Sequence, residues 1–196
     1  MPNWCYTNIT ISHYDEDRVK ELHDNLVKWL NISMENNGFD NGGKNPCWLG
    51  NIVLNSGINT DGIRYRGSVI QIDLDGNEIK IQTETAWGPM MKMWQRIANN
   101  YIPSATIIYT AEEDNMGIFY TNDEAYRNLY IIDAYGCDDI ESDWEAPESL
   151  VVEILQEKLN TDIGDITKLL EMFEDDDLSD EMAIHKWEFV PIDELD

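Results

Sequence analysis

Residues 69–84 contain the pattern that most restricts how this chain folds. Polar and apolar residues alternate on both sides of an Asp-Gly pair, with Ile70, Ile72 and Leu74 before Asp75-Gly76 and Ile79, Ile81 and Thr83 after it. Alternation with a period of two is typical of a strand that has one buried face, and Asp-Gly between two such runs is typical of a tight hairpin turn. The pattern predicts an antiparallel hairpin, which requires a sheet and a layer to cover it.

Further strands and helices are predicted around this hairpin. Cys5–Ser12 alternates like a strand, and Thr106–Tyr109 and Gly117–Tyr120 are two more short strand candidates. Asp15–Leu30 has apolar residues at helical spacing after an acidic first turn, which the helix dipole favours. Gly88-Pro89 opens a second helix whose apolar face contains Met90, Met93, Trp94 and Ile97. This order of elements predicts an α+β fold, with an antiparallel sheet and helices on one face.

The chain changes character after Thr121. We expect strands at Asn128–Tyr135 and Ile184–Val190, and helices at Ser149–Asn160 and Ile163–Phe173. Asp138–Glu148 has the composition of an acidic loop, and an acidic run follows at Glu174–Glu181. The predicted domain organisation is an α+β domain over residues 1–125 and an acidic, mainly helical extension over residues 126–196, packed on it.

Charge is the outstanding property of the composition. The 39 acidic and 13 basic residues give a net charge of −26. The charge is uneven, because Met1–Ala111 has a balance of −3 and Glu112–Asp196 a balance of −23. Such a chain is expected to be repelled by nucleic acids and anionic membranes, and to attract basic protein surfaces. The concentration of acidic residues in one region points to a specialised surface.

Two motifs in the first 125 residues resemble a known family. The N-terminus reads Pro2-Asn3-Trp4-Cys5, and Thr85-Ala86-Trp87-Gly88-Pro89 precedes the second helix. A later pattern consists of Tyr109, Glu112, Gly117, Phe119 and Tyr120. Together these are similar to the YubB-type ferredoxin-like domain family of phage and plasmid proteins. The resemblance implies a ferredoxin-like fold and an origin in a mobile element, and it implies no established reaction and no catalytic residues.

The residues themselves contain no recognisable catalytic motif. His13, His23 and His185 are scattered along the chain, and each is interpreted as structural. Trp4 and Trp87 are interpreted as core or strand-end packing. Asp73, Asp75, Asn77 and Glu84 have the spacing of calcium ligands, but Glu78 stands where a calcium loop needs glycine, so the hairpin explains them better. We therefore expect a protein that is not an enzyme and that has no cofactor and no metal site, although the acidic run at Glu174–Asp177 is a candidate for weak cation binding.

The strongest functional candidates are the acidic clusters of the C-terminal region. They alternate with apolar residues such as Ile140, Trp144 and Leu178, which favours a folded acidic surface over a free tail. Carboxylates held on a folded scaffold can imitate the charge of a nucleic-acid duplex. The predicted partner-binding residues are Asp138, Asp139, Glu141, Asp143, Glu145, Glu148, Glu174, Asp175, Asp176, Asp177, Asp180 and Glu181.

These observations lead to one principal hypothesis and two alternatives. The principal hypothesis is a phage-encoded inhibitor of a host defence protein that targets nucleic acid, such as a CRISPR effector or a restriction enzyme, through an acidic DNA-mimicking surface. Its partner is a basic, nucleic-acid-binding host protein, with no direct binding to nucleic acid or membrane. The alternatives are an interaction module without mimicry and an enzyme of unrecognised type; the acidity is also compatible with solubility alone.

Few cysteines and no signal sequence indicate where such a protein works. Cys5, Cys47 and Cys137 are odd in number and widely spaced, so a disulfide framework is not supported. The N-terminus lacks the basic and apolar segments of a signal peptide. The sequence therefore predicts a location in the cytoplasm of the bacterial host.

Overall fold

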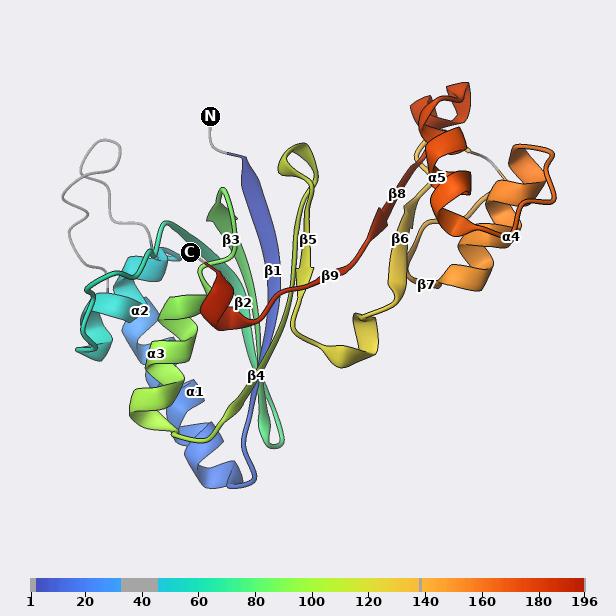
Figure 1. Cartoon of the computed structure of the whole chain (residues 1–196). Coiled ribbons are helices and arrows are strands. Elements are labelled where there is room, and N and C mark those ends of the chain that lie inside the picture. The colour runs from blue at the N-terminus through green and yellow to red at the C-terminus, as the bar shows by residue number, and fades with distance from the viewer. Residues whose placement is uncertain (1–2, 33–45, 138, 196) are drawn as a thin grey trace. The chain divides into compact units, whose positions relative to one another are not determined.

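The computed structural model describes residues 3–32, 46–137 and 139–195, and the chain forms two compact units (Figure 1). The first unit comprises Met1–Asn122 and Val190–Asp196, and the second comprises Asp123–Phe189. Each unit combines helices with strands, so the predicted α+β class is confirmed. None of the described helices has the length and apolar character needed to cross a membrane.

The first unit is built on a sheet in which its five strands follow the order β2-β3-β1-β4-β5. The pairs from β2 to β5 are all antiparallel. The elements of this unit are β1 (Trp4–Ser12), α1 (Glu16–Asn31), α2 (Leu49–Ser56), β2 (Gly67–Asp75), β3 (Glu78–Ala86), α3 (Met91–Tyr101), β4 (Thr106–Glu113), β5 (Ile118–Thr121) and the 3-10 helices at Asp114–Met116 and Ile192–Glu194.

The core of the first unit lies between the sheet and its helices. Alternation in β1 buries Cys5, Ile9 and Ile11, and Ile79 and Ile81 continue this face on the paired strand β3. The apolar stripes of α1 and α3 belong to the same core cluster, and both helices lie on one side of the sheet (Figure 1). The predicted arrangement of these two helices on one face is therefore confirmed.

The edge strand β2 differs from the simple alternation that the sequence predicted. The register with β3 shifts between Val69 and Gln71, which marks a bulge around Ile70. Val69 is consequently buried, whereas Ile70 is 55% exposed. A bulge re-aims the side chains beyond it and protects an edge strand from pairing with other chains.

Two other features of the first unit were not predicted. Helix α2 was missed, because an eight-residue segment with buried residues all round has no clear amphipathic stripe. Of the two interpretations given for Trp4 and Trp87, the structure supports strand ends and not the core, since Trp4 begins β1, Trp87 follows β3, and they are 42% and 50% exposed. Trp87 has a positive φ of 65°, and the Arg66 guanidinium lies 4.6 Å from its ring centroid. The loop expected at Asn36–Pro46 lies outside the described residues except for Pro46.

The second unit contains a three-stranded sheet with the order β7-β6-β8 and two α-helices. The acidic loop expected at Asp138–Glu148 is corrected, because Asp143–Pro147 of that segment forms strand β7. Only Ala146 of this strand is buried, so the segment carries no clear alternation signal. The elements are β6 (Leu129–Asp133), β7 (Asp143–Pro147), α4 (Glu148–Lys158), α5 (Ile166–Glu174), β8 (Ala183–Lys186), β9 (Glu188–Phe189) and the 3-10 helices at Glu124–Tyr126 and Asp177–Asp180.

A separate core stabilises the second unit. Its buried residues lie on β6, β7, α4 and α5 and directly before β8. They are Tyr130, Ile132, Ala146, Val151, Leu155, Leu169, Phe173 and Met182. Burying an apolar side chain contributes roughly 1.5–3 kcal/mol, so this cluster offsets part of the repulsion between the surrounding carboxylates.

The last residues of the chain return to the first unit. The Val190 backbone N–H donates to the Thr121 carbonyl at 2.8 Å, and the Tyr109 hydroxyl donates to the Val190 carbonyl at 2.7 Å. Ile192 and Leu195 are buried in the first core. An extension running from residue 126 to the C-terminus is therefore too long, since residues 190–196 belong with residues 1–122.

The burial of Trp94 gives a stability prediction. Its side chain is fully buried, so Trp94→Ala is expected to lower the free energy of unfolding by about 3–5 kcal/mol. Trp4→Ala is the matched control, and because Trp4 is partly exposed it is expected to cost about 1 kcal/mol or less. Denaturant titration of both variants measures the difference. Equal losses would mean that Trp94 does not hold the α3 face against the sheet.

Candidate functional site: an acidic surface with a pocket

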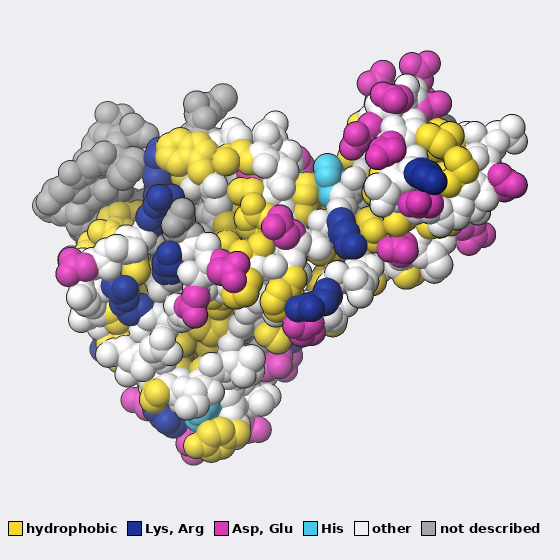
Figure 2. All heavy atoms as spheres, viewed as in Figure 1, with side chains coloured by type: hydrophobic (Ala, Val, Ile, Leu, Met, Phe, Trp, Pro, Cys, Tyr) yellow, Lys and Arg dark blue, Asp and Glu magenta, His cyan; other side chains and the backbone are white. Residues whose placement is uncertain are grey.

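The structure places the predicted site residues in the second unit, in two groups. Asp138 lies outside the described residues. The first group lies along the segment before β7, on β7 itself and at the first residue of α4. It contains Asp139, Glu141, Asp143, Glu145 and Glu148. The second group covers the end of α5 and the following turn, and contains Glu174, Asp175, Asp176, Asp177, Asp180 and Glu181. All eleven are exposed except Asp143, which is half-buried, and Figure 2 shows acidic side chains gathered on the surface of this unit.

One ion pair fixes the first group to α4. Lys158 Nζ lies 2.7 and 2.8 Å from the two carboxylate oxygens of Asp139. Donation from Lys158 lowers the pKa of Asp139, and the same hydrogen bond raises the pKa of Lys158. The Lys158 side chain is only 25% exposed, so this ammonium is partly enclosed by its surroundings.

Two tyrosines donate to carboxylates of the same group. The Tyr126 hydroxyl donates to Glu145 at 2.6 Å, and the Tyr130 hydroxyl donates to Glu148 at 3.3 Å. The hydrogen bond to Glu145, with burial and the carboxylate charge adding to it, raises the pKa of Tyr126 to about 12. Burial, followed by the charge of Glu148, raises the pKa of Tyr130. Both phenols therefore orient carboxylates while remaining protonated.

The second group is held by a turn with its own backbone contacts. The Asp176 carboxylate accepts from the Leu178 N–H at 2.9 Å and so caps the 3-10 helix at Asp177–Asp180. The Gly136 N–H donates to the Glu181 carbonyl at 2.7 Å. A Cβ atom on Gly136 would lie 2.9 Å from the Glu181 Cα, so only glycine permits this approach without a shift of the backbone. The turn that displays the second group is thus tied to the segment that leads to the first.

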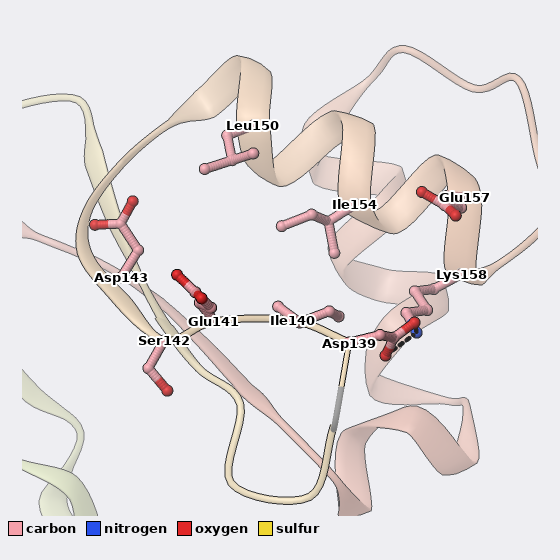
Figure 3. Close-up of a pocket in the computed structure, with 9 residues that line it drawn as sticks. All are labelled: Asp139, Ile140, Glu141, Ser142, Asp143, Leu150, Ile154, Glu157 and Lys158. Atoms are coloured by element: carbon pink, nitrogen blue, oxygen red, sulfur yellow. Dashed lines mark hydrogen bonds and ion pairs between the residues drawn. The ribbon is translucent and has the colours of Figure 1, made fainter.

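A pocket of about 430 Å³ lies between the segment that carries the first group and helix α4 (Figure 3). Leu150 and Ile154 project toward it from successive turns of α4, and Ile140 and Glu141 face them from the opposite segment (Figure 3). The complete lining is Asp139, Ile140, Glu141, Ser142, Asp143, Leu150, Ile154, Glu157 and Lys158. The pocket therefore combines an apolar floor with a rim of carboxylates.

Only part of this pocket was predicted from the sequence. Asp139, Glu141 and Asp143 were predicted as site residues, whereas Leu150, Ile154, Glu157 and Lys158 were not singled out. The i, i+4 spacing of Leu150, Ile154 and Lys158 is a helical signal, but it does not reveal which segment lies opposite. The structure brings these two parts together.

The side chains of this surface decide which chemistry it can offer. Among the described residues, no group of three or more His, Cys, Asp or Glu side chains is arranged to hold a metal ion. Burial and the nearby charge of Glu181 raise the pKa of the Cys137 thiol, which disfavours the reactive thiolate. What the site does offer is a dense set of exposed carboxylates on a folded scaffold, next to an apolar pocket.

The hydrogen bond between Tyr126 and Glu145 gives a pH prediction. A raised pKa means that the bond stabilises the fold below the ordinary tyrosine pKa of about 10, and that this contribution is lost as the pH rises through about 12. Glu145→Gln removes the charged acceptor, so Tyr126 is expected to ionise at lower pH. Absorbance titration of phenolate formation measures the shift, with Glu153→Gln on exposed α4 surface as the control. An unchanged titration in Glu145→Gln would contradict this assignment.

Comparison with protein-family models, with curated proteins and with solved structures gives no match for this chain. The resemblance to the YubB-type family remains a prediction from the sequence motifs. Functional inference therefore depends on the geometry and charge of the second unit.

Proposed function

We propose that this chain is a non-catalytic protein of a mobile element that inhibits a host defence protein that targets nucleic acid, such as a CRISPR effector. The concentration of charge in one folded unit carries this proposal. Residues 123–189 contain twenty-one acidic and four basic residues, which leaves a net charge of −17 on 67 residues. In this proposal the acidic surface occupies the basic channel of the defence protein and excludes its nucleic acid.

Electrostatics supports this function for the second unit. Like charges on one small fold repel each other and destabilise the compact state, so folding alone gives no reason to keep them. Three Lys or Arg side chains of the described second unit, Arg127, Lys158 and Lys168, form ion pairs with its carboxylates. Duplex DNA carries one charge per ~1.7 Å, and a channel built for it has lysines and arginines that would attract this surface.

The strand order of the first unit supports the ferredoxin-like part of the proposal. Its elements run β1, α1, β2, β3, α3, β4, with α2 inserted, and the strands lie in the antiparallel order β2-β3-β1-β4. This is the order of the split βαβ, ferredoxin-like arrangement. We therefore include a ferredoxin-like fold for this unit in the proposal, together with the YubB-type relationship that its motifs suggest and a location in the host cytoplasm.

A second candidate function is a protein-interaction module without mimicry. The pocket under α4 favours it, because an apolar floor formed by Ile140, Leu150 and Ile154 has no counterpart on the phosphate backbone of a duplex. In both candidates the partner is a basic protein. They differ in whether nucleic acid competes with this chain for it.

Charge reversal tests the principal function. Individual exposed ion pairs contribute under ~1 kcal/mol, so a whole cluster has to be changed. The variant replaces Glu174, Asp175, Asp177 and Asp180 with Lys and leaves the capping residue Asp176 in place. The control replaces four exposed acidic residues of the first unit with Lys, so it changes the net charge by the same amount as the variant. These residues are Glu21, Asp61, Asp73 and Asp114.

The measurement is DNA occupancy of guide-loaded CRISPR effectors and restriction enzymes in the presence of the full chain, at increasing salt. The parent and the control are expected to lower DNA occupancy, with an effect that weakens as ionic strength rises, and the variant is expected to have no effect. Inhibition by the cluster variant equal to that of the parent, or no inhibition of any nuclease by the parent, would rule out mimicry.

A further inference from the structure

The pocket between residues 139–143 and helix α4 has the lining of a site for one long basic side chain. We propose that it receives an arginine or lysine side chain of the partner protein. The aliphatic stem lies on Ile140, Leu150 and Ile154, and the cationic head lies at the carboxylates of Glu141 and Asp143. The inference builds on the proposed function only in taking the partner to be a basic protein.

The geometry of the lining fits an elongated group with an apolar stem and a charged end. Leu150 and Ile154 are one helical turn apart on α4, and both project toward the pocket, where Ile140 faces them (Figure 3). The volume of about 430 Å³ lies within the range of roughly 300–1,000 Å³ that is usual for ligand pockets. Lysine and arginine bury an alkyl stem on apolar surface and keep the charged head at its edge.

The chain already contains one example of this recognition. Lys158 lines one end of the pocket, and its ammonium lies on both oxygens of Asp139 while three quarters of its side chain is covered. This shows that the rim accepts a partly enclosed cation when a carboxylate is beside it. Among the described residues that line the pocket, Lys158 is the only basic one.

Carboxylates remain for a second cation. Glu141 and Glu157 form no ion pair among the described residues, and Asp143 uses one oxygen to accept the Glu145 N–H at 2.8 Å. These groups repel an anionic ligand. A neutral apolar group would pack on the apolar floor but would leave the carboxylates of the rim without a positive partner. Charge complementarity therefore favours a basic side chain.

A single amino-acid derivative tests the pocket without knowledge of the partner. The full chain, labelled with nitrogen-15, is titrated with Nα-acetyl-arginine N-methylamide, with the lysine analogue and with the uncharged citrulline analogue. We expect the arginine or lysine derivative to shift amide signals of residues 139–143 and of α4 in a saturable way. The citrulline analogue has the same stem without the charge and is expected to bind at least about tenfold more weakly.

Two variants separate the floor from the rim. Glu141→Gln combined with Asp143→Asn removes the head-group charges but keeps hydrogen-bond acceptors, and it is expected to weaken binding at least about tenfold. Ile154→Trp fills the pocket and leaves every charge in place, and it is expected to abolish the shifts. Glu153→Gln, an exposed change on the same helix, is the matched control and is expected to bind like the parent.

The inference is wrong if the charged and citrulline derivatives bind alike, or if the shifts spread over both acidic groups and do not depend on Ile154. Its failure is distinguishable from failure of mimicry. Loss of nuclease inhibition on charge reversal, together with full inhibition by Ile154→Trp, would support mimicry and overturn the pocket. Saturable arginine binding by a chain that inhibits no nuclease would support the pocket and overturn mimicry.

Discussion

Strand β1 is hydrogen-bonded along both of its edges, and the first unit depends on this pairing. Nine of its residues have partners on β3 and seven have partners on β4. A shift of one residue would turn Cys5, Ile9 and Ile11 to the opposite face, so register and burial fix each other. Helices α1 and α3 pack their apolar stripes on the face that this register defines.

The acidic residues of the second unit divide into those with a local task and those without one. Asp165 and Asp176 cap helices, and Asp139 holds Lys158, so each contributes to the fold that carries it. Asp175 and Asp177, in the turn after α5, are exposed and add charge repulsion. The fold of the second unit does not require their carboxylates. The fold of the second unit therefore accounts for the first kind of acidic residue and not for the second.

The sequence predicted those helices and strands whose own residues carry a clear periodic pattern or turn motif. The Asp75-Gly76 hairpin and the stripe through Trp94 were predicted because period and turn chemistry are local properties. The bulge at Ile70 and strand β7 were missed, because both depend on a neighbouring strand that the segment itself does not reveal. The site shows the same division. Acidic residues such as Glu141 were visible in the sequence, whereas the pocket exists only because residues 139–143 lie opposite Leu150 and Ile154.

The return of Val190 to Thr121 makes residues 123–189 an insertion in a continuous structural frame. The residues that flank it, Thr121 and Val190, are joined by a backbone hydrogen bond of 2.8 Å, so the chain leaves and re-enters the first unit at neighbouring positions. Truncation after Asn122 would remove Ile192 and Leu195 from the core along with this insertion. The core of the first unit is therefore completed only by residues from both ends of the chain, with Cys5 on β1 and Leu195 near the C-terminus in one cluster.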